Sequence, residues 1–251
     1  MAQLEEIAVK NVLIIPMLLA IVLSTGCAEK SSQESLDGIG SIYTTNYANE
    51  VLEYYYYIPA SINDAPQKSY PMLVMIPGLS GLGEHFVSQQ YKQFAETEGF
   101  IVASPSFVWD KDNWDFKRSY QYPSAWSGDA LLNIIDQFET QNGISISKLY
   151  LFGISAGAQF ALRFCLWKPD QCAACAAHGS GGRVIPSNYI DVAFLISVGE
   201  QDIPDRHAHW RDFCNAAKKL GIEVQCNRYD VGHRLSINQI NDSLDFFKQY
   251  R

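Results

Sequence analysis

Short apolar runs alternate with amphipathic segments along most of this chain, and this alternation limits the folds it can adopt. The runs are rich in β-branched residues and have the length of strands buried on both faces of a sheet. The segments between them space apolar residues by three and four, as helices do. The expected strands cover 72–76, 100–103, 149–152, 172–177, 192–198 and 222–229, and the expected helices cover 85–98, 127–142, 156–168, 205–220 and 237–250.

An antiparallel hairpin is expected ahead of these elements. Residues 43–48 and 51–58 alternate polar residues with apolar or aromatic ones on either side of a short polar turn. The whole order predicts an α/β fold with a mostly parallel sheet of about eight strands and helices on both of its faces. In such folds the functional side chains lie at the carboxyl ends of the strands.

The N-terminal segment is typical of an export signal. Lys10 precedes an apolar stretch, residues 12–23, that is too short to cross a bilayer comfortably. Small residues at 24–26 then stand directly before Cys27, an arrangement that resembles the signal of bacterial lipoproteins. The resemblance implies that residues 1–26 are a signal peptide and that Cys27 becomes an acylated N-terminus. Ordinary secretory cleavage and a buried N-terminal helix are the alternatives.

The segment after Cys27 is predicted to be a tether. Residues 31–40 are polar and Ser-rich, so residues 27–41 are assigned to the tether and 42–251 to one folded domain. We therefore expect an exported protein, either anchored to a membrane as a lipoprotein that faces the periplasm or the cell surface, or secreted. The formal net charge of -8 and the lack of a basic stripe exclude nucleic acid as a partner.

The other cysteines predict disulfides, since an exported protein oxidises thiols that lie close together. The favoured pairs are Cys165 with Cys172 and Cys214 with Cys226, each of which would join a helix to the following strand. Cys172 and Cys175 have the spacing of redox and zinc sites. Residues three apart on a strand face opposite sides, however, so neither role is expected.

The chain carries one motif for nucleophilic chemistry. Gly153 and Gly157 flank Ser155 as Gly-x-Ser-x-Gly, between an expected strand and an expected helix. A serine on this tight turn needs small neighbours, because the strand and the helix approach closely there. The N–H groups at the start of the helix would stabilise a developing oxyanion. Ser155 is therefore the predicted nucleophile.

From about Tyr43 onward the chain resembles the α/β-hydrolase superfamily, and within it the dienelactone hydrolase and polyhydroxybutyrate depolymerase-like esterases. Pro77 departs from this pattern, because many members have His there. The resemblance implies that the backbone N–H groups of Leu79 and Ala156 form the oxyanion hole, and that no metal or organic cofactor is needed. It rests on Ile76-Pro77-Gly78-Leu79, Gly153-Ile154-Ser155-Ala156-Gly157, Gly199-Glu200-Gln201-Asp202-Ile203-Pro204 and Gly232-His233.

Five histidines compete for the role of general base. His233 follows the last expected strand, which brings it to the sheet edge where Ser155 stands, and it is our choice. His178 also ends a strand, but the Gly-rich turn after it favours a place in the wall of the substrate pocket. His207 and His209 lie two apart on an expected helix, so they do not share a face as metal ligands would.

Three carboxylates follow the strand at 192–198. Asp202 lies on the turn after Gly199 and is the predicted acid of the triad, which holds the base in the right tautomer. Glu200 remains an alternative, since one residue of turn geometry decides between them. Asp205 is predicted to cap the helix that starts near Arg206.

A long segment between an expected strand and helix, residues 105–126, is rich in aromatic residues. A loop of this length at the carboxyl end of a strand is usually functional, so Trp109, Trp114 and Trp126 are predicted to line the substrate pocket. The alternative is that these rings pack the loop onto the domain.

These features predict a serine hydrolase that cleaves carboxylic esters of small molecules or polymers through an acyl-enzyme. A peptidase or amidase would use the same three residues. A binding lipoprotein without catalytic activity is a third alternative, and the complete set of Ser155, Asp202 and His233 argues against it.

Overall fold

The computed structural model describes residues 34–44, 51–63, 68–107 and 119–251. The strands in these ranges are β1 (Leu36–Tyr43), β2 (Val51–Ile58), β3 (Ser69–Ile76), β4 (Ile101–Pro105), β5 (Ser145–Ile154), β6 (Cys172–His178), β7 (Ala193–Gly199) and β8 (Val224–Tyr229). The α-helices are α1 (Ala60–Asn63), α2 (Gln89–Glu98), α3 (Gly128–Asn142), α4 (Ala156–Trp167), α5 (Pro204–Leu220) and α6 (Ile237–Gln249). Shorter helices are η1 (Glu84–Phe86), η2 (Pro123–Ser127) and η3 (Pro169–Gln171).

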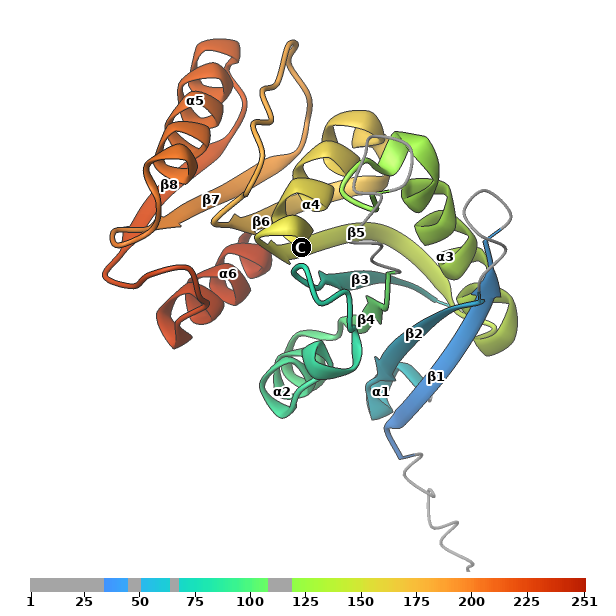
Figure 1. Cartoon of the computed structure of the whole chain (residues 1–251). Helices are drawn as coiled ribbons and strands as arrows, with labels where there is room; N and C mark the ends of the chain where they lie inside the picture. Colours follow the sequence, from blue (N-terminus) through green and yellow to red (C-terminus); the bar gives the residue numbers. More distant parts are fainter. Residues whose placement is uncertain (1–33, 45–50, 64–67, 108–118) are drawn as a thin grey trace, which may run out of the picture. The chain divides into compact units, whose positions relative to one another are not determined.

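The strands form one sheet of eight, in the order β1-β2-β4-β3-β5-β6-β7-β8 (Figure 1). β1 and β2 pair antiparallel, β2 also runs antiparallel to β4, and the remaining strands are parallel. A hairpin followed by a mostly parallel sheet is present as predicted, but the first strand covers Leu36–Tyr43 and not residues 43–48, of which 45–48 lie outside the described residues. The chain reverses its direction across the sheet at β3 and β5, where a doubly wound fold places its ligands.

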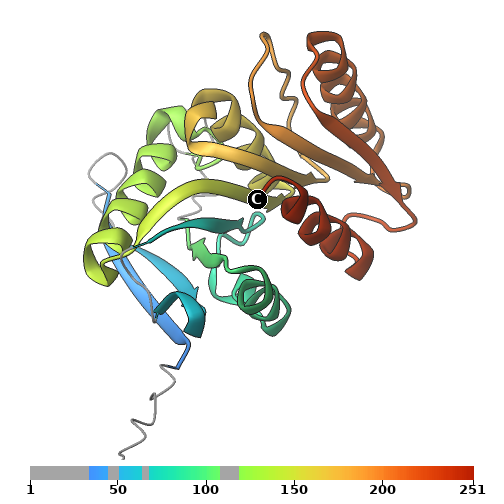
Figure 2. The ribbon, with the colours of Figure 1, turned by 180° about the vertical axis from the view of Figure 1, so that it is seen from behind.

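Helices cover both faces of the sheet (Figures 1 and 2). One face packs against α3, α4 and α5, with fully buried rings such as Phe138, Phe160 and Phe213. The other face packs against α2 and α6, which bury Phe94 and Phe247. Because both faces are covered, the central strands are apolar throughout, which is why they appear as continuous apolar runs in the sequence.

The predicted boundary between tether and domain was wrong. β1 begins at Leu36 and pairs with β2 along its length, so the fold begins before residue 42. The two glycines of β1, Gly38 and Gly40, have a structural role. A Cβ added at Gly38 would lie 2.1 Å from the ring of Tyr56, and one at Gly40 would lie 2.1 Å from the ring of Tyr54. The two tyrosine rings occupy the space that side chains of β1 would need.

One of the two predicted disulfides is present. Cys214 on α5 is bonded to Cys226 on β8, with Cα atoms 6.3 Å apart. The pairing of Cys165 with Cys172 was wrong, because both are free and buried, as is Cys175. Burial, together with the neighbouring Cys172 and Cys175, raises the pKa of the Cys165 thiol well above its usual value.

The expectation that Cys172 and Cys175 face opposite sides was also wrong. Leu149 pairs with Cys172 but the next residue, Tyr150, pairs with Ala174, so a β-bulge leaves Ala173 as an extra residue. The bulge turns both cysteines to the face that packs against α4, where Cys165 also lies.

No helix within the described ranges is long and apolar enough to span a membrane.

Candidate active site

Ser155 occupies a strained turn between β5 and α4. Its φ is 57° and its ψ is −114°, and within the described ranges it is the one non-glycine residue with a positive φ. The glycines beside it are needed for close backbone contact: a Cβ at Gly153 would lie 2.4 Å from the Gly157 carbonyl oxygen, and one at Gly157 would lie 2.2 Å from that of Ile76. Such strain persists where the surrounding structure enforces it, and it is common at functional sites.

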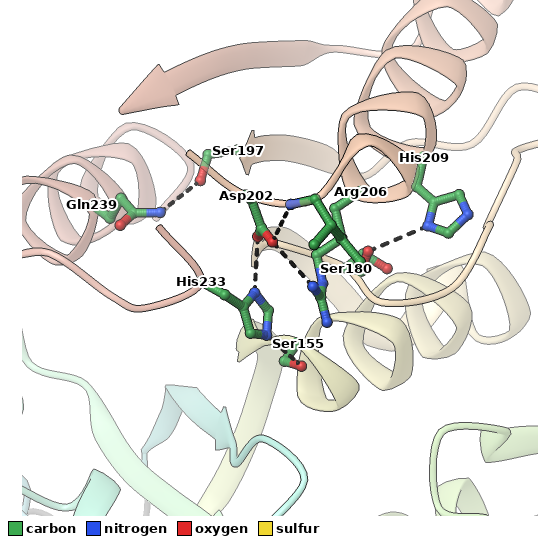
Figure 3. A network of polar contacts seen from close by, with 9 residues as sticks. Ser155, Ser180, Ser197, Asp202, Arg206, His209, His233 and Gln239 are labelled. Atoms are coloured by element: carbon green, nitrogen blue, oxygen red, sulfur yellow. Dashed lines mark hydrogen bonds and ion pairs between the residues drawn. The ribbon is translucent and has the colours of Figure 1, made fainter. Parts of the chain in front are cut away.

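His233 and Asp202 meet Ser155 at the carboxyl ends of the strands (Figure 3). The Nε2 atom of His233 lies 3.0 Å from Ser155 Oγ, and its Nδ1 atom lies 2.9 Å from Asp202 Oδ2. An ionised carboxylate only accepts hydrogen bonds, so the imidazole carries its proton on Nδ1. Nε2 is then free to accept the hydroxyl proton of Ser155.

Asp202 is held in place from three sides. Its side chain is 2% exposed, and besides His233 it accepts hydrogen bonds from Ile203 N–H at 2.8 Å and from Arg206 Nη1 at 3.0 Å, both on Oδ1. Burial by itself raises the pKa of this carboxyl, but the hydrogen bonds from His233 and Ile203 and the charges of His233 and Arg206 outweigh burial and lower the pKa. The carboxylate therefore stays ionised.

Sequence reasoning missed Arg206, which lies on the first turn of α5 and pairs with Asp202 (Figure 3). A signal existed, because residues four apart meet where a helix begins, and Arg206 follows Asp202 by this spacing. Asp205 does not cap the helix as predicted. α5 begins at Pro204 with Ile203 at the cap position, so Asp205 lies in the first turn and is exposed. Glu200 is exposed as well.

His178 is buried next to the site, where it borders a small cavity together with Asp202 and His233. The residue is 1% exposed, and its Nδ1 and Nε2 atoms lie 2.6 Å from Ser197 Oγ and 2.9 Å from Ser243 Oγ. Ser243 donates its own proton to the carbonyl of Gln239, so His178 donates from Nε2 and accepts at Nδ1. The neutral ring satisfies every partner, and burial lowers its pKa to about 3. The ring ties α6 to β6 and β7.

The loop after β3 adjoins Ser155. A Cβ added at Gly78 would lie 3.9 Å from Ser155 Cβ. A Cβ added at Gly157 would lie 2.5 Å from the carbonyl oxygen of Pro77, so the start of α4 touches the same loop. The predicted oxyanion donors, Leu79 N–H and Ala156 N–H, belong to these two segments. As the first residue of α4, Ala156 has an N–H without an intrahelical acceptor.

The aromatic segment is described only at its ends. Trp126 is buried, with 2% exposure, and its ring meets that of Phe107 edge to face, so it packs the segment onto the domain and does not line a pocket. Trp109 and Trp114 lie outside the described residues.

No group of three or more His, Cys, Asp or Glu in the described ranges is arranged to hold a metal ion.

Comparison with known proteins supports the fold. No family model matches the chain. Acetylxylan esterase A of Emericella nidulans is 27% identical over 108 residues, which are 42% of this chain, so the chain spans about a third (34%) of that curated relative. A ferulic acid esterase has a similar structure over 87% of this chain and 100% of its own, with a TM-score of 0.67 and 15% identity. A poly(3-hydroxybutyrate) depolymerase from Bordetella parapertussis matches over 85% and 91%, with a TM-score of 0.60 and 18% identity.

The chain thus has the α/β-hydrolase fold, as the sequence predicted. Its eight-stranded, mostly parallel sheet with helices on both faces matches those solved structures, which are α/β-hydrolase esterases. Ser155, Asp202 and His233 stand in the chain order that this fold uses for its nucleophile, acid and base.

Proposed function

We propose that this protein hydrolyses carboxylic esters through an acyl-enzyme formed on Ser155. The observation that carries the proposal is the continuous chain of contacts from Ser155 Oγ through His233 to Asp202, at 3.0 Å and 2.9 Å, with the serine on a strained turn. A binding protein has no need of this arrangement, because each contact serves to move a proton.

Acylation follows from the geometry. His233 Nε2 takes the proton of Ser155 as its oxygen attacks the ester carbonyl, and Asp202 stabilises the imidazolium that forms. The oxyanion receives hydrogen bonds from the N–H groups of Leu79 and Ala156. The C–O bond of the ester then breaks, and His233 returns its proton to the leaving alcohol.

Deacylation repeats these steps with water. His233 removes a proton from the water as the latter attacks the acyl carbonyl, and the proton then passes to Ser155 Oγ as the acid is released. Every proton that is taken is returned, so the cycle needs no cofactor.

An ester substrate is favoured over an amide by the names of three of the similar proteins: an acetylxylan esterase, a ferulic acid esterase and a poly(3-hydroxybutyrate) depolymerase. We infer that the substrate is a small-molecule or polymer ester. A serine peptidase or amidase would use the same triad. Turnover of ester and anilide forms of one acyl group decides between them.

The first experiment is covalent labelling with a fluorophosphonate probe, which requires an activated serine. We expect the wild-type protein to be labelled and Ser155→Ala to be inert. Ser155→Ala and His233→Ala should each lower kcat by a factor of about 10⁴ or more while the fold is kept. An active Ser155→Ala protein would contradict the proposal.

A matched pair of variants tests the acid. Asp202→Asn should lower kcat by a factor of about 10⁴, because an amide favours the wrong tautomer of His233. Asp205→Asn is the control: it makes the same change three residues along, on an exposed side chain, and should leave kcat close to wild type. If the two results are exchanged, the acid has been misassigned.

We also propose that the protein is exported and anchored through acylated Cys27. The features that support this proposal are the leader over residues 1–26, which lies outside the described residues, and the bond between Cys214 and Cys226, which suits an oxidising compartment. The intact mass of the mature protein tests it. An unmodified N-terminus at any other residue would exclude the lipoprotein, and Cys27→Ser should release the protein or block processing.

A further inference from the structure

Tyr120 connects the aromatic segment to the loop that carries a predicted oxyanion donor. The residue is fully buried, and its hydroxyl lies 2.6 Å from the carbonyl oxygen of Gly78 and 3.1 Å from that of Pro77. A phenol has one proton to donate, and the shorter contact identifies Gly78 as its main acceptor.

The Gly78 carbonyl and the Leu79 N–H are two ends of one peptide group. A trans peptide is planar, so the two bonds point in opposite directions and cannot turn independently. A hydrogen bond that fixes the carbonyl of Gly78 therefore fixes the direction of the Leu79 N–H. The Gly81 N–H donates to the same carbonyl oxygen at 2.9 Å, and this hydrogen bond closes a turn over residues 78–81.

Tyr120 is itself held rigidly. Its ring stacks on that of Phe107, with centroids 5.0 Å apart and planes 13° apart. Its backbone carbonyl accepts a hydrogen bond from Ser127 Oγ at 2.7 Å. A donor with so little freedom can hold the peptide in one orientation before a substrate arrives.

We infer that Tyr120 is a positioning residue for the oxyanion hole, which acts by orienting and polarising the peptide between Gly78 and Leu79. The inference rests on the proposed function. Donors that already point at the developing charge stabilise a transition state without a cost of reorganisation at the moment of reaction. A hydrogen bond to the carbonyl also polarises the peptide and strengthens its N–H as a donor.

The phenol keeps its proton under working conditions. Burial raises the pKa of Tyr120 far above that of a free tyrosine, so the group stays neutral and remains a donor. The contribution of Tyr120 is therefore independent of pH over the range in which His233 acts.

The competing explanation is that Tyr120 only packs the aromatic segment onto the domain. Tyr120→Phe separates the two, because it keeps the stacked ring and removes the hydroxyl. The matched control is Tyr150→Phe. The Tyr150 hydroxyl also donates to a backbone carbonyl, that of Tyr250, and its ring is likewise buried, but on the face that packs against α2 and α6.

We expect Tyr120→Phe to lower kcat about tenfold, a smaller loss than removal of a direct oxyanion donor causes, with KM within about twofold of wild type. The inhibition constant of a trifluoromethyl ketone, which forms a tetrahedral adduct with Ser155, should rise by the same factor as kcat/KM falls. The pH at which kcat/KM is half-maximal should not move, because the triad is intact. Tyr150→Phe should change none of these values.

Three results would overturn the inference while the proposed function stands: kcat of Tyr120→Phe within twofold of wild type, an equal loss in Tyr150→Phe, or a shifted pH profile that indicates a displaced His233. If Tyr120→Phe does not fold, Ser127→Ala replaces it, since it frees the backbone of Tyr120. Ser127→Ala should then lower kcat and weaken the binding of the trifluoromethyl ketone by similar factors. An unchanged kcat would again refute the role of Tyr120. A wild-type protein that neither reacts with the fluorophosphonate nor cleaves esters overturns the proposed function and this inference with it.

Discussion

His178 ends β6 and His233 follows β8, both close to Ser155, and their different burial gives them opposite properties. His233 keeps 35% of its side chain exposed and contacts the carboxylate of Asp202, so a positive charge on it would have a counter-charge. His178 is 1% exposed and contacts two hydroxyl groups, with no charged partner in the part of the chain that the structure describes. A positive charge on His178 would be buried without a counter-charge, so the neutral ring links β6 to β7 and α6 through its hydrogen bonds.

The buried histidine should make stability depend on pH. The folded protein has a pKa of about 3 at His178, whereas an unfolded histidine has a pKa of about 6.5. Its neutral form is thus favoured in the fold, so its stabilisation is complete above pH 6.5 and is lost as pH falls towards 3. In that window the free energy of unfolding of the wild type should fall by up to about 1.4 kcal/mol per pH unit more than that of His178→Gln.

Urea unfolding between pH 3 and pH 7 measures this slope. His85→Gln serves as the control, since His85 is exposed in η1, and its slope should equal that of the wild type. Parallel curves for the wild type and His178→Gln would mean that His178 does not titrate abnormally.

The described ends of the segment between β4 and α3 have two structural roles, packing into the core and contact with the loop after β3. Phe107 contacts the rings of Tyr120, Trp126 and Phe160, so the described ends of the segment are part of the main core. Tyr120 also reaches the loop after β3. The packing explanation therefore holds for these rings. Trp109 and Trp114 remain predicted pocket residues, and their distinct role can be tested against that of Trp126.

Trp126→Ala should lower the free energy of unfolding by about 3–5 kcal/mol, because it empties a fully packed site. Trp109→Ala and Trp114→Ala should instead raise KM for bulky or aromatic acyl esters far more than for acetate esters, with Tm little changed. Thermal unfolding and a panel of acyl esters measure both effects. An equal loss on all esters with a large drop in Tm would assign Trp109 and Trp114 to packing as well.

The disulfide links the two parts of the chain that carry Asp202 and His233. Cys214 lies on α5, the helix that follows Asp202, and Cys226 lies on β8, the strand that precedes His233. β7 and β8 are also paired directly, and Gln201 N–H donates to the Val231 carbonyl at 3.1 Å between the two turns. The site thus has a covalent and a hydrogen-bonded support.

Removal of the disulfide should lower stability without removing activity. Cys214→Ser combined with Cys226→Ser opens a short loop, which should cost about 3 kcal/mol of unfolding free energy, while kcat at 25 °C stays close to wild type. Denaturant unfolding and ester turnover test this. Alkylation of the denatured protein without reductant should label Cys165, Cys172 and Cys175, and labelling of Cys214 would show that the bond is absent.

The strand and helix pattern could be predicted from the sequence, because it depends on nearby residues. Ser155, Asp202 and His233, which the structure brings into contact, could also be selected as candidates. Helices end where expected: Gly99, Gly143 and Gly221 all adopt the left-handed conformation at a helix end. Ser155 is recognisable because the strained turn imposes glycine at fixed short spacings. The candidates for base and acid were limited to positions directly after strands, which meet at one edge of a parallel sheet.

Most features that sequence analysis missed depend on contacts between distant segments, whereas the pair of Asp202 and Arg206 joins residues only four apart. Gly38 and Gly40 belong to a strand because the rings of Tyr56 and Tyr54 cover them, and no local pattern contains both partners. A single bulged residue in β6 reverses the facing of every residue after it, which an alternation rule cannot foresee. The support of Gly78 by Tyr120 likewise joins residues far apart in the chain, which packing alone brings within hydrogen-bond distance.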